Sequence, residues 1–370
     1  MAKLGEVCLL KAGKFVSAND ISPEYNKGLY PCFGGNGIRG YVADYTHDGE
    51  FPLIGRQGAL CGNVNLASGK FHATEHAVVV QPKIEMNVHW LYYALNAMNL
   101  GQYATGAAQP GLAVSKLETL SIEIPNISEQ NKIAQTLYKV EQLVNFRKQQ
   151  LAKLDELVKA RFVEMFGNPS NNSLGFPYEP LSNCLLSIEN GKSFVCSNDM
   201  RQEENPAILK LSAVTYGVYQ QDENKAILDS SMFVKSAEVH KGDLLFTRKN
   251  TPELVGMCAY VNDTAPNLMM PDLIFRLNTN EKINKIFLWK LINHEFFRGK
   301  IQNIATGSAK SMSNISKERL EKLAIILPPL HLQNDFAALV ERVDQQKQTI
   351  QQSLEKLELL KKALMQEYFG

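Results

Sequence analysis

An internal duplication constrains the fold of this 370-residue chain more than any other feature of its sequence. The string Leu-Ser-Ile-Glu-Ile-Pro at 120–125 returns about 200 residues later as Leu-Ala-Ile-Ile-Leu-Pro at 323–328. A repeat of this length is a domain rather than one turn of a solenoid, so two copies of one unit are predicted. The other shared strings are Gly13-Lys14 and Gly191-Lys192, Ala104-Thr105-Gly106 and Ala305-Thr306-Gly307, Ser115-Lys116 and Ser316-Lys317, Gln130-Asn131 and Gln333-Asn334, and Phe166-Gly167 and Phe369-Gly370.

A long amphipathic helix follows the shared string in each copy. Its apolar residues recur at alternating three- and four-residue steps, which is the spacing of a coiled-coil seam. The seam residues are Ile133, Leu137, Val140, Val144, Leu151, Leu154, Val158 and Met165, and then Phe336, Val340, Val343, Ile350, Leu354, Leu357 and Leu364. Polar residues that would fix the pairing interrupt both seams, at Arg147, Arg161, Lys347 and Lys361. The alternative is an ordinary long helix that lies on its own domain.

The first helix has clear start and stop signals. Asn126 or Ser128 can cap its N-terminus, and the turn-rich string Gly167-Asn168-Pro169 ends it. The fold class expected is α+β, with two mixed α/β domains separated by two long helices. The predicted bounds are 1–125 and 168–328 for the domains, and 126–167 and 329–370 for the helices.

Between the shared strings the two copies differ in sequence. Short apolar runs set off by glycines predict strands, among them 77–80, 208–211, 243–246 and 257–261. Helices are predicted at 89–100 and 286–297, and an exposed tip at 248–251. Two domains that share a fold but differ in their loops could recognise two different ligands.

Charge and cysteine usage limit the classes of function. The net charge is +1, and no segment is basic: residues 1–110 hold 8 basic and 8 acidic side chains, and residues 171–310 hold 15 of each. Because phosphate neutralisation supplies most non-specific DNA affinity, the chain alone is expected to bind DNA weakly. Six scattered cysteines without a CxxC pair indicate reduced thiols in a cytoplasmic protein. Neither a signal peptide nor a membrane helix is expected.

Together these features resemble the specificity subunit of a type I restriction–modification system. The resemblance covers essentially the whole chain. It rests on the order of domain and helix, on the glycine-rich loops at 34–40 and 55–58, on Lys-Gly-Asp-Leu-Leu-Phe-Thr-Arg at 241–248, and on the duplicated joint before each helix. It implies that the mixed domains are target-recognition domains, each reading one half of a split double-stranded DNA site.

The resemblance also implies an assembly. The helices would pair as an antiparallel coiled coil, set the spacing and dock two modification subunits, which carry the S-adenosylmethionine; restriction subunits would join a larger complex. No cofactor is then expected in this chain. Some relatives continue beyond the position of Gly370 into a further tail, so a role for such a tail stays open.

The sequence argues against several kinds of catalytic site. The string His-Ala-Thr-Glu-His at 72–76 matches H-x-x-E-H, but its neighbours predict a loop entering a strand, where residues four apart lie about 13 Å from one another. An NPPF-type methyltransferase motif, a Walker or dinucleotide loop and a nuclease motif are all absent from the sequence. The chain is therefore expected to be a non-catalytic subunit.

The remaining expected function is recognition of DNA bases by the two mixed domains. Arginine and lysine suit guanine, asparagine and glutamine suit adenine, and other polar groups hold phosphates. The first-domain candidates are Asn36, Arg39, Arg56 and Gln57, with Lys70 and Gln109 behind them. The second-domain candidates are Lys192, Tyr216, Arg248, Lys249, Asn250 and Lys310. For each, the competing interpretation is an ordinary loop residue, or rim packing for the tyrosine.

Two other functions stay open at this point. One is the specificity subunit of a type IIB-like system, in which one partner chain both cuts and methylates. The other is a coiled-coil interaction scaffold that never touches DNA, which the flat charge favours and the paired loop-rich domains disfavour.

Overall fold

A computed structural model of the protein describes residues 1–106, 110–307 and 312–370. The chain forms two compact units, one of residues 1–150 with 350–370 and one of residues 151–349. Each unit contains part of both long helices, α4 (Ile127–Phe166) and α9 (Leu330–Phe369). The first unit is therefore assembled from two stretches that are far apart in sequence.

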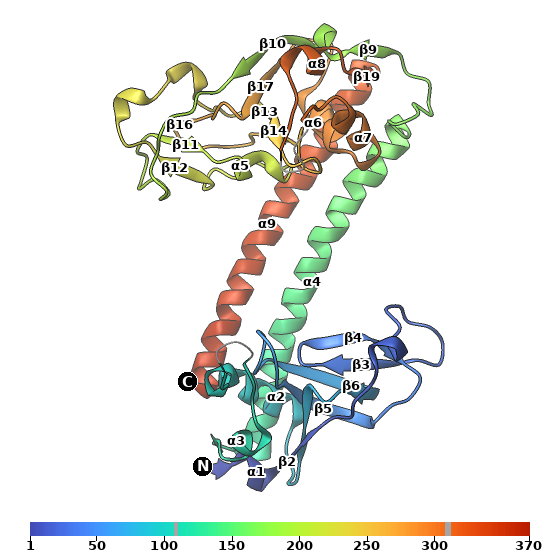
Figure 1. The fold of residues 1–370 in the computed structure, drawn as a ribbon, viewed down its shortest axis with the longest axis vertical. Helices are drawn as coiled ribbons and strands as arrows, with labels where there is room; N and C mark the ends of the chain where they lie inside the picture. The colour runs from blue at the N-terminus through green and yellow to red at the C-terminus, as the bar shows by residue number, and fades with distance from the viewer. Residues whose placement is uncertain (107–109, 308–311) are drawn as a thin grey trace. The chain divides into compact units, whose positions relative to one another are not determined.

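The first unit is built on a six-stranded sheet in the order β2-β7-β5-β6-β3-β4 (Figure 1). All its strand pairs are antiparallel except β3 with β6. The strands are β2 (Cys8–Ala12), β3 (Tyr30–Gly34), β4 (Gly37–Val42), β5 (His47–Gly55), β6 (Val64–Ala73) and β7 (Ala77–Pro82). The remaining elements are the β1–β8 pair (Ala2–Lys3, Ser121–Ile122), α1 (Leu4–Val7), α2 (Val88–Ala97), α3 (Val114–Glu118), η1 (Ala18–Asp20) and η2 (Leu100–Tyr103).

The second unit has a four-stranded sheet, β10-β17-β13-β15, and a three-stranded sheet, β12-β11-β16 (Figure 1). Their strands are β10 (Leu185–Asn190), β17 (Ile274–Thr279), β13 (Leu244–Thr247), β15 (Cys258–Tyr260), β12 (Asn224–Ala226), β11 (Ala207–Leu209) and β16 (Leu268–Met269). Two short pairs join β9 (Tyr178–Pro180) to β19 (Ala324–Ile326) and β14 (Lys249–Asn250) to β18 (Ser313–Asn314). The helices are η3 (Leu181–Cys184), α5 (Ser212–Thr215), η4 (Ser230–Met232), η5 (Lys235–Ala237), α6 (Lys285–Asn293), α7 (Glu295–Asn303) and α8 (Lys317–Glu321).

Both long helices contribute to the core of each unit. In the second unit, Phe162 of α4 packs on Phe287 of α6 and Phe336 of α9, with ring centroids 5.9 and 5.4 Å apart. In the first unit, Trp90 of α2 faces Phe369 of α9 at 6.4 Å. Aromatic pairs at these distances add to the free energy of burial, so the ends of the helices are anchored in the domain cores.

Every predicted seam position is buried or half-buried. Three of the four polar interruptions contact the other long helix inside their own unit. Lys361 pairs with Glu141 at 2.7 Å, Arg147 donates to Ser353 Oγ at 3.3 Å, and Lys347 pairs with Asp155 at 2.6 Å. Arg161 instead pairs with Glu164 of its own helix at 2.7 Å. These partners explain how charged side chains are tolerated along an apolar stripe.

A glutamine–asparagine pair binds each long helix to its domain in the same way. In the first unit, Gln130 Oε1 accepts from the backbone N–H of Asn87 at 2.9 Å, and Asn131 Oδ1 accepts from the Asn87 side chain at 2.7 Å. Gln130 Nε2 also donates to the carbonyl of Pro125 at 2.8 Å. Because Asn87 caps α2 through Trp90 N–H, the pair fixes α2 on α4.

The second unit repeats this clamp. Gln333 Oε1 accepts from Asn284 N–H at 2.9 Å, its Nε2 donates to the carbonyl of Pro328 at 2.7 Å, and Asn334 accepts from the Asn284 side chain at 3.0 Å. Asn284 caps α6. The repeated Gln-Asn string therefore has a structural basis in both copies.

The helix signals read from the sequence are largely confirmed. Asn126 accepts from Glu129 N–H at 3.0 Å as the cap of α4, and Gly167 ends that helix at a φ of +69°. The predicted helix at 286–297 is wrong as one element, because α6 stops at Asn293, His294 is extended and caps the next helix, and α7 begins at Glu295. The exposed tip predicted at 248–251 is also wrong, because β14 pairs there with β18 and buries Asn250.

Two further observations concern the described residues. None of their helices combines the length and the apolarity needed to cross a membrane. All six cysteines are free thiols, and Cys8, Cys32, Cys184 and Cys258 are buried.

Candidate nucleic-acid interface

In the first unit, an arginine lies between two loops at the end of a central strand. Arg56 directly follows β5. Its backbone N–H donates to the carbonyl of His76 at 3.0 Å, and its own carbonyl accepts from Leu112 N–H at 2.9 Å. The backbone of Arg56 is thus held on both sides by segments distant in sequence.

The second unit holds an arginine in the same way. Arg248 directly follows β13. Its N–H donates to the carbonyl of Leu273 at 2.9 Å, and its carbonyl accepts from Ile315 N–H at 2.8 Å. Arg56 and Arg248 therefore occupy equivalent positions in the two copies.

The loop beside each arginine is also duplicated. Thr105 and Gly111 exchange two backbone hydrogen bonds of 2.8 Å, and so do Thr306 and Asn314. Thr105 and Thr306 are the first residues of the Thr-Gly strings that the sequence repeats. In each copy, the residue that pairs with the threonine directly precedes the residue whose N–H binds the arginine carbonyl. These residues are Gly111 before Leu112 and Asn314 before Ile315.

The Gly-Lys strings complete the arrangement. Lys14 N–H donates to the carbonyl of Ala73 at 2.8 Å, and Lys192 N–H donates to that of Met270 at 3.0 Å. We call residues 13–14, 55–57, 73–76, 105 and 111–112 the first loop cluster. Residues 191–192, 247–249, 270–273, 306 and 314–315 form the second loop cluster.

Close backbone contacts explain why glycine recurs in the clusters. A Cβ at Gly13 would lie 2.1 Å from the carbonyl oxygen of Ala73, and one at Gly191 would lie 2.1 Å from that of Pro271. A Cβ at Gly55 would lie 1.9 Å from the carbonyl oxygen of Gly35. No side chain fits at these distances, so the loops can meet only at glycine.

Three of the predicted first-domain residues come together at the first loop cluster. Asn36 lies in the β3–β4 turn next to Gly35 and accepts from Asn63 Nδ2 at 2.8 Å. Gln57 follows Arg56 and forms a bridge with Gly111. Asn36 and Gln57 are exposed, as base-reading side chains need to be.

The other first-domain candidates lie elsewhere or outside the described residues. Arg39 is exposed on β4 and its side chain covers Gly34. Lys70 lies at the opposite end of β5 and β6 from Arg56, opposite Asp48, with its Nζ 4.7 Å from the centre of the Tyr45 ring. Gln109 lies outside the described residues.

The second loop cluster holds Lys192, Arg248 and Lys249. Lys192 is exposed. The guanidinium of Arg248 lies 5.0 Å from the centre of the Phe275 ring and donates to Asn314 Oδ1 at 3.3 Å. Lys249 is half-buried and pairs with Asn314 in the β14–β18 ladder. Lys310 lies outside the described residues.

Asn250 and Tyr216 lie next to this cluster in different environments. Asn250 is only 8% exposed, donates to Thr215 Oγ1 at 3.0 Å and accepts from Thr251 N–H at 2.9 Å. Its hydrogen-bonding groups are used within the protein. Tyr216 is 66% exposed and lines a cleft of about 530 Å³ that also includes Trp289 and Lys290. In that cleft, burial lowers the pKa of Lys290 to about 8.

The sequence candidates omitted an acidic residue that both clusters share. Glu75 and Asp272 each precede the residue whose carbonyl binds the arginine N–H. Glu75 pairs with His76 at 3.1 Å, and Asp272 accepts from Ser193 Oγ at 2.5 Å. A signal existed, because Glu75 lies in the H-x-x-E-H string, which the sequence suggested only as a metal motif. The string was predicted to be a loop entering a strand; its first two residues are instead the end of β6, and a turn at 75–76 leads into β7.

Comparison with known proteins identifies relatives of this arrangement. A family model described as "Type I restriction modification DNA specificity domain" matches residues 1–156 and 185–359. The EcoprrI specificity subunit of a type I restriction enzyme from Escherichia coli is 53% identical over 143 residues, covering 38% of this chain and 36% of that protein. The EcoEI specificity subunit, from the same organism, is 27% identical over 194 residues, covering 50% of this chain and 33% of that protein. The chain thus spans about a third of the length of these curated relatives.

A solved structure has the same fold. The crystal structure of the S subunit from a type I restriction–modification system of M. genitalium matches with a TM-score of 0.70 at 15% identity. The match covers 100% of this chain and 95% of that one. The two-domain architecture with long helices is therefore shared.

Proposed function

Because the chain belongs to the type I restriction–modification DNA specificity family, we propose that it is the subunit that selects the DNA sequence for such a complex. Each recognition domain reads one half of a split double-stranded site. The proposed recognition domains are residues 1–125 and 168–328, and the proposed spacer helices are 126–167 and 329–370.

The observation that carries this proposal is the pair of loop clusters. The hydrogen bonds that build them are the same in both copies, while the side chains they present differ: Gln57 stands where Lys249 does, and His76 where Leu273 does. Different side chains on one framework suit two different half-sites, since base edges are told apart by donor and acceptor pattern. We propose Asn36, Gln57 and Lys249 as leading base contacts, with Arg39, Lys70, Gln109, Lys192, Tyr216 and Lys310 as further DNA-contact candidates. Asn250 is the weakest because its amide is already bonded.

We propose that the long helices pair as an antiparallel coiled coil and set the distance between the half-sites. Support comes from the order of the ion pairs, in which Glu141, Lys148 and Asp155 of α4 contact Lys361, Glu358 and Lys347 of α9. Positions rise along one helix as they fall along the other. Each helix has 40 residues, so it is about 60 Å long at 1.5 Å per residue.

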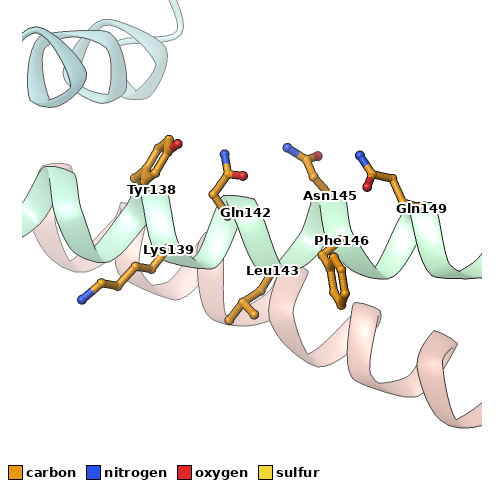
Figure 2. A pocket seen from close by; sticks show the side chains of 7 residues that line it. All are labelled: Tyr138, Lys139, Gln142, Leu143, Asn145, Phe146 and Gln149. Atoms are coloured by element: carbon orange, nitrogen blue, oxygen red, sulfur yellow. The ribbon is translucent and has the colours of Figure 1, made fainter.

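The helices also offer a surface for the proposed modification subunits. Figure 2 shows a shallow depression on α4, with Leu143 and Phe146 pointing to one side of the helix and Tyr138, Gln142, Asn145 and Gln149 to another. Leu143 and Phe146 are 46% and 54% exposed. Exposed apolar side chains grouped on one helix are typical of a protein interface. Two modification subunits, and restriction subunits in the larger complex, are the proposed partners.

We propose that this chain is not itself catalytic. S-adenosylmethionine would bind to the modification subunits, which would methylate adenine in the selected site. The near-neutral net charge of +1 fits a subunit that gains much of its DNA affinity within the complex.

Adenine methylation mapped across a genome tests this function. The chain is co-expressed with its modification subunit in a host that lacks other adenine methyltransferases, and methylated positions are read by long-read sequencing. We expect one split motif with two defined halves and a fixed gap, which disappears when this chain is omitted. Methylation without a motif, or no methylation with a folded complex, would contradict the proposal and favour the interaction scaffold. A copurifying partner that also cuts DNA would indicate the type IIB-like system.

A further inference from the structure

We infer that Arg56 and Arg248 make the same contact in the two recognition domains, a link to a backbone phosphate, and that neither arginine reads a base. The inference rests on the proposed function and adds one phosphate site to each half-site. Three observations carry it: the equivalence of the two positions, the unmatched charge of the two side chains, and their fixed backbones.

Arg56 and Arg248 are identical in the two copies, whereas the residues directly before and after them differ. The residue before each differs, Gly55 against Thr247, and the residue after each differs, Gln57 against Lys249. Within these three residues only the arginine is retained, on the same two backbone hydrogen bonds. If two domains recognise different DNA sequences, a side chain that is identical in both is expected to contact a feature that both half-sites have in common. What every duplex segment shares is its phosphate backbone, and phosphate contacts position the protein without carrying sequence information.

Neither arginine is paired with an anion in the part of the chain that the structure describes. Among the residues that the structure describes, no carboxylate forms an ion pair with either guanidinium. The Nε atom of each is buried and has no hydrogen-bond partner in the described parts of the chain. The acidic residues in the clusters contact other groups: Glu75 Oε1 lies 3.1 Å from His76 Nε2, and Asp272 accepts from Ser193 Oγ.

A half-buried guanidinium without an anionic partner favours an anion brought by a ligand. Arginine suits phosphate because its planar fork matches two phosphate oxygens. The side chain of Arg248 already donates to a neutral amide, Asn314 Oδ1 at 3.3 Å, and lies over Phe275. These contacts orient the guanidinium and leave its positive charge uncompensated.

The backbones of both arginines are fixed before DNA arrives. Each N–H and each carbonyl is bonded to a different loop, at 2.8 to 3.0 Å. A fixed backbone lowers the ordering cost of binding. A contact from this arginine to DNA would also position the neighbouring loops, because the loops that carry the variable side chains are hydrogen-bonded to the arginine backbone. The arginine would thus set the position from which Gln57 or Lys249 reaches the bases.

The test measures binding of the whole complex with its modification subunit to duplexes that contain the split motif or lack it. We expect Arg56→Ala and Arg248→Ala each to weaken binding about 10- to 100-fold, the range for one hydrogen-bonded charge. The loss should be similar on both duplexes. The slope of log affinity against log salt should fall by about 1 for each variant. Arg→Lys variants, which keep the charge, should restore the salt slope.

Two variants serve as matched controls. Arg201→Ala removes the same charge from an arginine that donates to the carbonyls of Asn205 and Pro266 in its own region, and it should leave the salt slope unchanged. Gln57→Ala should change the sequence of one methylated half-site. Thermal unfolding of each variant confirms that the chain is folded.

The outcomes separate the inference from the proposed function. If Arg56→Ala or Arg248→Ala changes a base preference in its own half-site and leaves the salt slope intact, the arginine reads a base and the inference fails alone. Unchanged binding in both variants also overturns it. If the unaltered complex methylates no split motif, the proposed function fails, and this inference fails with it.

Discussion

At the scale of single residues, Lys290 is a side chain whose protonation is coupled to folding. Its Nζ lies 3.4 Å from the centre of the Trp289 ring, and burial lowers its pKa from 10.5 to about 8. Asp344 and Asp155 oppose that shift, and Lys347 adds to it. Because the folded pKa is below the unfolded one, the unfolded chain binds more protons between about pH 8 and 10.5. Lys290 therefore destabilises the fold below pH 8, and the penalty is relieved as pH rises through that window.

We expect Lys290→Met to stabilise the second unit by about 1 kcal/mol at pH 7.5, after discounting for the partial exposure of the side chain. The gain should shrink by pH 9.5, where the unaltered lysine is largely neutral. Denaturant unfolding at both pH values measures it. The comparison with the variant is essential because burial raises the pKa of Cys8 and Cys258, which lowers stability as pH rises. A gain of equal size at both pH values would contradict the assignment.

The sequence predicted some residues at the loop clusters and missed others for physical reasons. Arg56 and Arg248 were both predicted, but their equivalence was not, because the strings around them share only the arginine. The equivalence lies in backbone hydrogen bonds to segments far along the chain, which no local pattern encodes. Asn250 was predicted to be exposed because Lys-Asn-Thr is typical of a turn, but pairing with β18 buries it.

At the scale of elements, the clamps that join α4 and α9 to their domains are the most specific device of the fold. Gln333 is fully buried, and its side chain satisfies the N–H of Asn284 and the carbonyl of Pro328. Gln130 does the same for Asn87 and Pro125 in the other unit. A buried polar group without its partner costs about 1–3 kcal/mol.

We expect Gln333→Leu to destabilise the second unit by about 2–4 kcal/mol, because two buried backbone groups lose their partners. Hydrogen exchange should speed up in α6 and stay unchanged in α2. Gln130→Leu is the matched control and should show the reverse. Equal loosening of α2 and α6 in one variant would show that the clamps are not local.

Element prediction succeeded where the pattern was long. The helix α4 begins and ends within a residue of its predicted bounds, and α9 begins within a residue of its predicted start, because an apolar seam of many turns and the glycine stop after α4 are clear signals. The sheets were predicted only as separate strands. Their order, such as β2-β7-β5-β6-β3-β4, depends on pairings between distant segments, and a one-residue slip would reverse every side chain.

At the scale of the whole molecule, the proposed spacing role predicts a graded response to helix length. Removing seven residues from the middle of both α4 and α9 keeps the seam in phase and shortens each helix by about 10 Å. At 3.4 Å per base pair, the gap in the methylated motif should shrink by about three base pairs. Both half-sites should stay the same. Methylation mapping reads all three quantities, and an altered half-site with an unchanged gap would overturn the spacing role.

The first unit consists of two separate chain segments, and this affects how the chain can fold during synthesis. Its core includes Trp90, close to the beginning of the chain, and Phe369, close to the end. The second unit needs nothing beyond residue 349. During synthesis, the first unit can therefore complete its fold only after all residues of the second unit have been made. Until residues 350–370 emerge, the first unit would have an incomplete core, so this segment limits when that unit can finish folding.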